Sequence, residues 1–161
     1  MTDTRNTEIF DTTETEMDAV SMLKADHEKV NALFEEYEKA ESDEEKKELV
    51  AEICAELSVH AQLEEEIFYP AFKAAHEDKM LVPEATVEHA TMMSLIEQIE
   101  GIEPDGEDYD AKVKVLSEYV KHHVKEEQSE MFTKAKTDSL DLDELGALMA
   151  ERKIDLLAER D

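Results

Sequence analysis

The sequence has few residues that form turns or disulfides. Its 161 residues include 3 Gly, 3 Pro, one Cys and no Trp. This composition argues against β-sandwiches, β-barrels and collagen-like repeats, which need many turns or periodic glycine. The one cysteine, Cys54, cannot form an intramolecular disulfide, which is typical of a reducing compartment, so we expect a cytoplasmic protein.

Basic side chains are also scarce. The chain has 17 Lys and Arg against 44 Asp and Glu, which gives a formal net charge of -27. An acidic surface repels the phosphates of nucleic acids and anionic lipids, and it attracts small cations and basic partners. No apolar stretch is long enough for a signal-peptide core or a membrane span. We therefore expect neither nucleic acid nor a membrane as a partner.

The apolar residues follow the period of amphipathic helices. They predict four long helices, over about residues 17–40, 42–75, 83–100 and 109–131. Ser42 and Glu45 have the spacing of a capping box at the start of the second helix, and Pro70 should kink or restart that helix. Asp141 is placed to cap a fifth, amphipathic helix.

Four long helices with short connections pack most simply as an up-down-up-down bundle. The predicted fold is therefore all-α. It has three parts: a loose, disordered acidic N-terminal arm (1–16), the four-helix bundle (17–135) and an extra C-terminal amphipathic helix (136–161).

Two of the predicted bundle helices carry the same motif, H-x-x-x-E. His60 and Glu64 form one copy, and His123 and Glu127 form the other. Residues four apart lie one turn apart on nearly the same side of a helix, so the imidazole and the carboxylate converge on one point and supply half of a metal site. The adjacent pair His122 and Glu126 has the same spacing, and only one of the two pairs can face the bundle axis.

The other two bundle helices each contribute a histidine that follows an acidic residue. These are Asp26-His27 and Glu88-His89, and both histidines lie on the apolar side of their helices. A single inward histidine is usually a hydrogen-bonded core residue. Four helices that each contribute one inward histidine, two with a carboxylate one turn later, predict a metal site. Imidazole and carboxylate ligands suit iron, manganese and zinc.

Together these motifs resemble the hemerythrin-like HHE cation-binding family over about residues 17–135. The resemblance implies a four-helix bundle around two iron ions with a bridging oxide or hydroxide, in which the two glutamates also bridge. Manganese or zinc are alternative metals. Carried over by position, the implied metal ligands are His27, His60, Glu64, His89, His123 and Glu127.

Two positions depart from the family pattern. Oxygen-carrying hemerythrins have a fifth histidine one turn after the third, where this chain has Met93, and Gln128 stands where relatives often have an acid. Because a thioether is a poor ligand for ferric iron, we expect each ion to keep an exchangeable position or to gain a further residue such as Tyr119 or Glu56. This expectation favours redox chemistry over oxygen carriage as the function.

The sequence thus predicts a non-haem di-iron protein that binds, senses or reduces dioxygen, hydrogen peroxide or nitric oxide. Whether it is an enzyme stays open; if it is one, we expect a peroxide- or nitric-oxide-directed oxidoreductase of catalase or peroxidase type. The alternatives are a non-catalytic iron-binding, iron-handling or oxygen-carrying module, and a structural bundle that holds zinc or manganese. The sequence is compatible with a monomer or a homodimer.

Overall fold

The computed structural model describes residues 17–104, 106–136 and 140–160, and these ranges contain helices and no strands. The predicted all-α fold is confirmed. The predicted N-terminal arm, residues 1–16, lies outside the described residues. None of the described helices is long and apolar enough to cross a membrane. The helices are α2 (Ala19–Lys39), α3 (Asp43–Leu63), η1 (Glu64–Phe68), α4 (Tyr69–His76), α5 (Leu81–Glu100), α6 (Glu107–Glu126), η2 (Glu127–Met131), α7 (Phe132–Ala135) and α8 (Leu142–Arg160).

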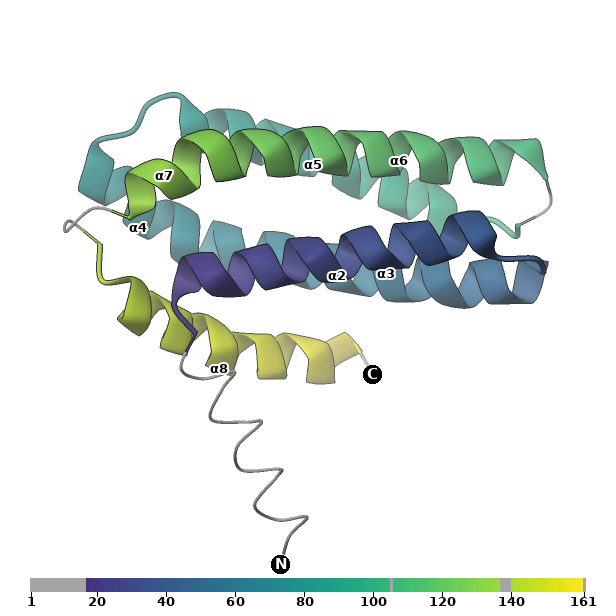
Figure 1. The fold of residues 1–161 in the computed structure, drawn as a ribbon, viewed down its shortest axis with the longest axis horizontal. Coiled ribbons are helices and arrows are strands. Elements are labelled where there is room, and N and C mark those ends of the chain that lie inside the picture. Colours follow the sequence, from purple (N-terminus) through teal and green to yellow (C-terminus); the bar gives the residue numbers. More distant parts are fainter. Residues whose placement is uncertain (1–16, 105, 137–139, 161) are drawn as a thin grey trace, which may run out of the picture.

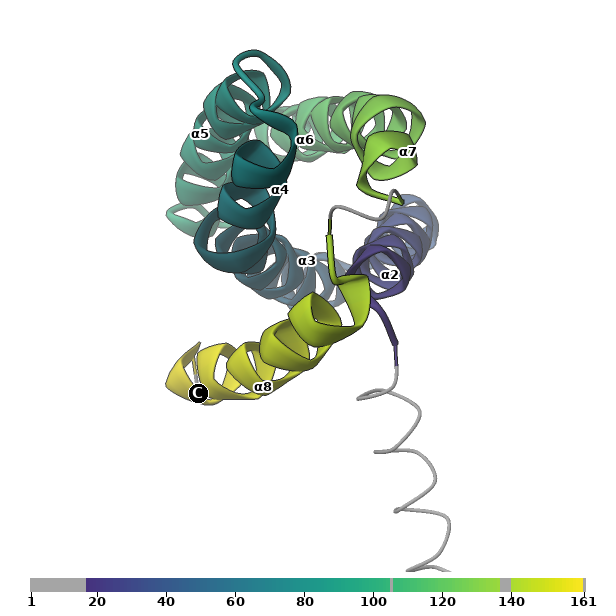
Figure 2. The ribbon, with the colours of Figure 1, turned by 90° about the vertical axis from the view of Figure 1, so that its left-hand side faces the viewer.

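Four rods form the bundle. They are α2; α3 with η1 and α4; α5; and α6 with η2 and α7, and each runs antiparallel to the one before it (Figure 1). Seen along their length, the four rods surround a common axis, while α8 lies outside them (Figure 2). Helix α8 packs against α2 and α3.

Side-chain caps fix where several helices begin. The Asp18 carboxylate accepts a hydrogen bond from the Ser21 amide at 2.7 Å at the start of α2. Ser42 accepts one from the Glu45 amide at 3.1 Å at the start of α3, as the capping-box pattern predicts. Each cap satisfies an amide that has no partner within its own helix.

Two rods contain one π-helical turn each, and both turns begin at the glutamate of an H-x-x-x-E motif. In η1 the Tyr69 amide donates to the Glu64 carbonyl, five residues earlier, and in η2 the Phe132 amide donates to the Glu127 carbonyl. Pro70 lies in the first turn of α4, where its missing amide hydrogen costs little. The rod therefore continues from the π turn η1 through Pro70 into α4. A π turn within a helix often marks a functional site.

Apolar side chains form two clusters, one toward each end of the bundle. The first includes Leu23, Leu63 and Phe132, together with residues of α8, and the second begins at Val30 and includes Leu57. Along α2 the apolar clusters leave a gap between Leu23 and Val30. Buried polar residues fill that level of the bundle.

Helix α8 approaches the start of α2 very closely at Gly146. A Cβ atom added there would lie 2.3 Å from the Met17 carbonyl oxygen and 2.9 Å from the Ala19 amide nitrogen, both of them backbone atoms. The absence of a side chain at this position is therefore what lets α8 lie against the bundle.

The variant Gly146→Ala should lower the free energy of unfolding by about 1–3 kcal/mol, because the new methyl group overlaps backbone that must move. Helix propensity alone predicts the opposite, a gain of about 1 kcal/mol. Urea unfolding followed by circular dichroism measures the difference. Gly101→Ala is the control, because its Cβ would meet nothing closer than 3.4 Å. A G146A protein as stable as the wild type would contradict the close contact.

Candidate metal centre

Ionisable side chains are concentrated at one level of the bundle, between the two apolar clusters. Burying polar groups there is costly unless each finds a partner. The buried polar residues of the described chain are Asp26, Glu56, His60, Glu64, His89, His123 and Glu127. The side chain of His27, only 7% exposed, joins them.

The four histidines meet in two pairs. The Nε2 atoms of His27 and His60 lie 3.2 Å apart, and those of His89 and His123 also lie 3.2 Å apart. The first pair joins α2 to α3, and the second joins α5 to α6. Each pair therefore presents two ring nitrogens to one point inside the bundle.

Each of the two glutamates contacts both histidine pairs. Glu64 Oε1 lies 3.3 Å from His60 Nε2 and 3.1 Å from His89 Nε2. Glu127 Oε1 lies 3.1 Å from His27 Nε2, and its Oε2 lies 3.5 Å from His123 Nε2. The carboxylates thus span the space between the pairs.

This arrangement fits metal ions. Glu64 Oε2 and Glu127 Oε1 are buried and accept no hydrogen bond, although Glu127 Oε1 lies 3.1 Å from His27 Nε2, and this is costly for an anionic oxygen. Two buried groups have donor atoms within 4.8 Å of one another: His27, His60, Glu64 and Glu127 form one, and Glu64, His89 and His123 form the other. A third group with this spacing, Glu88, His122 and Glu126, is not buried. The donors are nitrogen and oxygen without thiolate, a set that suits iron, manganese or zinc.

The outer nitrogen of each ring is bound by a side chain from another helix. His60 Nδ1 lies 3.0 Å from Asp26, and His123 Nδ1 lies 2.6 Å from Glu88. His89 Nδ1 lies 2.7 Å from Glu65, and His27 Nδ1 lies 2.9 Å from the Gln128 amide oxygen. When Nδ1–H donates to these oxygens, Nε2 is left free to bind a metal, as in known metal sites.

The same contacts shift the pKa values of the metal-free site. Burial disfavours the imidazolium of His123, but Glu127, Glu64 and Glu88 together outweigh it, and the pKa of His123 rises to about 9. The pKa of His60 is also raised, because Glu64 and Asp26 outweigh its burial. For the same reason the pKa of Glu64 is held well below its usual range, by His60 despite full burial.

Tyr69 is a site residue that the sequence analysis did not identify. Its hydroxyl donates to Glu127 Oε2 at 2.6 Å and lies 3.2 Å from Glu64 Oε1 and 3.3 Å from His89 Nε2. Burial and the two carboxylates raise the pKa of Tyr69. In an unbroken α-helix Tyr69 would lie about 140° around from Glu64, and only the π turn brings the two side chains together.

The remaining candidates have other neighbours than the clustered glutamates, although Met93 lines a cavity beside the four histidines. Tyr119 is 44% exposed on the surface of α6. Glu56 is buried and pairs with Lys29 at 2.7 Å, and Met93 accepts a weak hydrogen bond from Ser58. The alternative pair His122 and Glu126 lies on the outside of α6, with the two side chains 3.0 Å apart.

Comparisons with known proteins agree with this geometry. The family model of the Hemerythrin HHE cation binding domain matches residues 18–135. A crystal structure of a Hemerythrin HHE cation binding domain-containing protein from Mycobacterium kansasii superposes with a TM-score of 0.77 and 25% identity, over 89% of each chain. A protein of Nostoc sp. named DNA nickase is 31% identical over 117 residues, which are 73% of this chain. The matched region spans only 33% of that relative's length.

The metal-free protein should lose stability as the pH rises from about 6.5 to 9. A raised pKa means that the folded protein binds the proton more tightly than the unfolded chain, so this stabilisation is complete below about pH 6.5. It is lost as the pH passes the pKa of His123, about 9, and is worth at most about 3 kcal/mol.

Urea unfolding of the metal-free protein at pH 6, 7.5 and 9 measures this loss. His123→Asn should reduce the dependence, with His60 supplying the remainder, whereas His122→Asn, a change to its exposed neighbour, should leave it as in the wild type. A wild-type stability that rises over this interval would contradict the assignment of protons to the buried rings.

Proposed function

This chain belongs to the hemerythrin HHE cation-binding family over residues 18–135, and on this premise we propose that it is a non-haem di-iron protein. Its ions, with a bridging oxide or hydroxide, would bind dioxygen, hydrogen peroxide or nitric oxide, so that the protein senses or reduces them. One observation supports this proposal above the others: two glutamates, each in contact with both histidine pairs, form a cluster for two cations.

The proposed ligands divide into two positions. His27 and His60 would hold the first ion, His89 and His123 would hold the second, and Glu64 and Glu127 would reach both. When bound, two iron ions supply two exchangeable electrons and coordination positions for a small ligand. Tyr69, with its hydroxyl 3.3 Å from His89 Nε2, adds an oxygen donor beside the second position.

A small apolar cavity adjoins the centre, and its size supports the proposal that a small molecule binds there. All four histidines line it, together with Leu57, Met92, Met93 and Val120, among other side chains. Its volume is about 20 Å³, enough for one water-sized molecule. Met93 occupies the wall of this cavity and leaves it apolar. A site of this size and lining suits a diatomic molecule or peroxide better than an organic substrate.

An acidic groove supports a second candidate function, the handling of iron without catalysis. Glu84, Glu88, Glu126 and Glu130 line it, together with His123 and Glu127 of the cluster. The carboxylates lie close enough that Glu126 raises the pKa of Glu84. Such a groove attracts divalent cations toward the buried ligands.

The name of the Nostoc relative does not change this proposal. The match covers 33% of that protein, so its named activity has ample room outside the matched region. A net charge of -27 repels the phosphate backbone over most of this chain's surface. We therefore propose no DNA-directed function here.

Metal analysis tests the ligand assignment. Protein loaded with ferrous iron should retain two ions per chain and show a charge-transfer band after oxidation. The double variant H123A/E127A should lose the ion bound by that pair together with the band, because both residues lie at the cluster. The matched variant H122A/E126A removes the exposed pair of the same helix and should keep both ions. Equal metal loss in the two variants would contradict the assignment.

Filling the cavity tests the proposal that peroxide or nitric oxide binds beside the histidines. Val120→Phe should slow peroxide consumption and nitric oxide binding by about tenfold or more, because its ring occupies the space beside the histidines. The iron content should not change. Val115→Phe, at a position 40% exposed on the same helix, is the control. Wild-type protein that takes up and releases iron but neither consumes peroxide nor binds nitric oxide would favour iron handling instead.

A further inference from the structure

The two histidine pairs differ in the charge of their outer partners, the side chains that bind the Nδ1 atoms of the rings. The chain places equivalent residues around each pair: Asp26 precedes His27 and binds His60, and Glu88 precedes His89 and binds His123. The residue after each motif glutamate then binds the remaining ring. That residue is Glu65 for the second pair but Gln128 for the first.

The second pair, His89 and His123, therefore rests on two carboxylates. The contacts of its Nδ1 atoms with Glu65 and Glu88 are 2.7 and 2.6 Å. In the part of the chain that the structure describes, neither carboxylate has a salt bridge to a lysine or arginine. No side-chain cation therefore compensates either negative charge, and water screens Glu65, which is 44% exposed, more than Glu88, which is 22% exposed.

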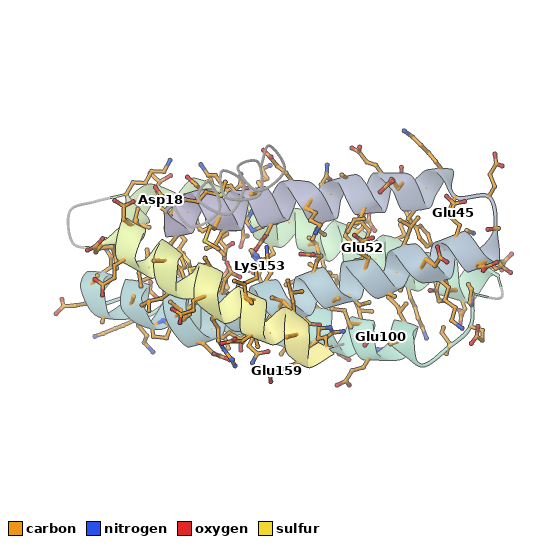
Figure 3. All side chains as sticks on the ribbon, turned by 90° about the horizontal axis from the view of Figure 1, so that it is seen from below. Asp18, Glu45, Glu52, Glu100, Lys153 and Glu159 are labelled. Carbon is orange, nitrogen blue, oxygen red and sulfur yellow. The ribbon has the colours of Figure 1, made fainter. Side chains whose placement is uncertain are left out.

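The Nδ1 atoms of the first pair, His27 and His60, contact one carboxylate, that of Asp26, and a lysine compensates its charge. Asp26 binds His60 through Oδ2 and Lys153 through Oδ1, at 3.0 and 2.9 Å. Lys153 comes from α8, outside the bundle, and extends between α8 and α2 (Figure 3). Its side chain is 16% exposed and that of Asp26 is 8% exposed, so water screens this pair only weakly.

We propose that the two metal positions are electrostatically unequal, and that Gln128 and Lys153 make the His27–His60 position the weaker one. This inference rests on the proposed two-metal centre. A carboxylate that accepts from Nδ1 makes the imidazole a stronger donor to a cation, whereas an amide or a lysine-bound carboxylate does so less. The outer charges sum to about zero at the first position and about -2 at the second.

The number of donors does not reverse this order. Glu64 and Glu127 both contact the first pair, but Glu127 Oε2 also lies 3.5 Å from His123 Nε2. The Tyr69 hydroxyl stands beside the second pair only. The His89–His123 position should therefore fill first and hold its ion more tightly. Lys153 is a positioning residue that acts on the ion through Asp26 and His60.

Stepwise zinc binding tests the inequality. The full-length, metal-free protein is titrated with Zn²⁺ against a competing chelator, and NMR signals of the histidine rings show which position fills at each step. Wild-type protein should bind two ions in steps that differ at least about tenfold in affinity, with His89 and His123 first. Lys153→Met should tighten the second step about tenfold, because Asp26 then acts on His60 with its full charge.

Other variants distinguish an effect of the charges around the histidines from an effect of altered packing. Lys153→Arg restores the cation and should behave as wild type, and Gln128→Glu should tighten the same second step. Glu88→Gln should weaken the first step by about 10–100-fold. Arg152→Met removes the neighbouring cation of α8, which pairs with Glu66 and not with a histidine partner, and should change neither step.

The outcomes distinguish this inference from the proposed function. Wild-type protein that takes up no zinc would contradict the metal centre itself. Two ions bound in equal steps that K153M does not change would overturn the inequality alone. Weaker binding in K153M would show that Lys153 only holds Asp26 in place, and this would overturn its electrostatic role.

Discussion

The structure depends on one constraint: ionisable side chains from four helices are buried at a single level of a bundle that is otherwise apolar. Without partners, so many charges would destabilise the fold. The bundle meets the constraint by binding the outer nitrogen of all four rings to side chains of other helices. The inner nitrogens and the motif carboxylates then face one another, and two carboxylate oxygens still lack partners. Cations complete this arrangement better than protons do, because one cation can bind several of these atoms at once.

Much of this arrangement follows from spacings within single helices, and the sequence predicts that part well. The H-x-x-x-E motif places His60 and Glu64 on one side of a helix whatever surrounds it. The all-α bundle, the cap at Ser42 and the family were predicted from such local patterns, and the fold and family are confirmed. The spacing within the motif does not distinguish His122 from His123, and only the residues that follow each motif, Phe68-Tyr69 and Met131-Phe132, favour His123.

Other features depend on contacts between helices and are invisible to a periodic pattern. Asp26 and Glu88 each bind the histidine of the following helix, because consecutive residues point about 100° apart around a helix. Tyr69 was missed for a related reason. A π turn adds a residue to the helical register, and a search at α-helical spacing rotates Tyr69 away from the site. One signal was present in the sequence: an aromatic residue stands five positions after each motif glutamate, Tyr69 after Glu64 and Phe132 after Glu127.

Lys153 extends the proposed metal centre beyond its proposed ligands. It lies 127 residues from Asp26 in sequence and belongs to a helix that contributes no ligand. Helix α8 lies against the bundle because Gly146 leaves space for the start of α2, and the same placement brings Lys153 to Asp26, the carboxylate that contacts His60 Nδ1. The packing of α8 and the charge around His60 are therefore linked. A change that moves α8 also changes how strongly the His27–His60 position attracts a cation, although no ligand has moved.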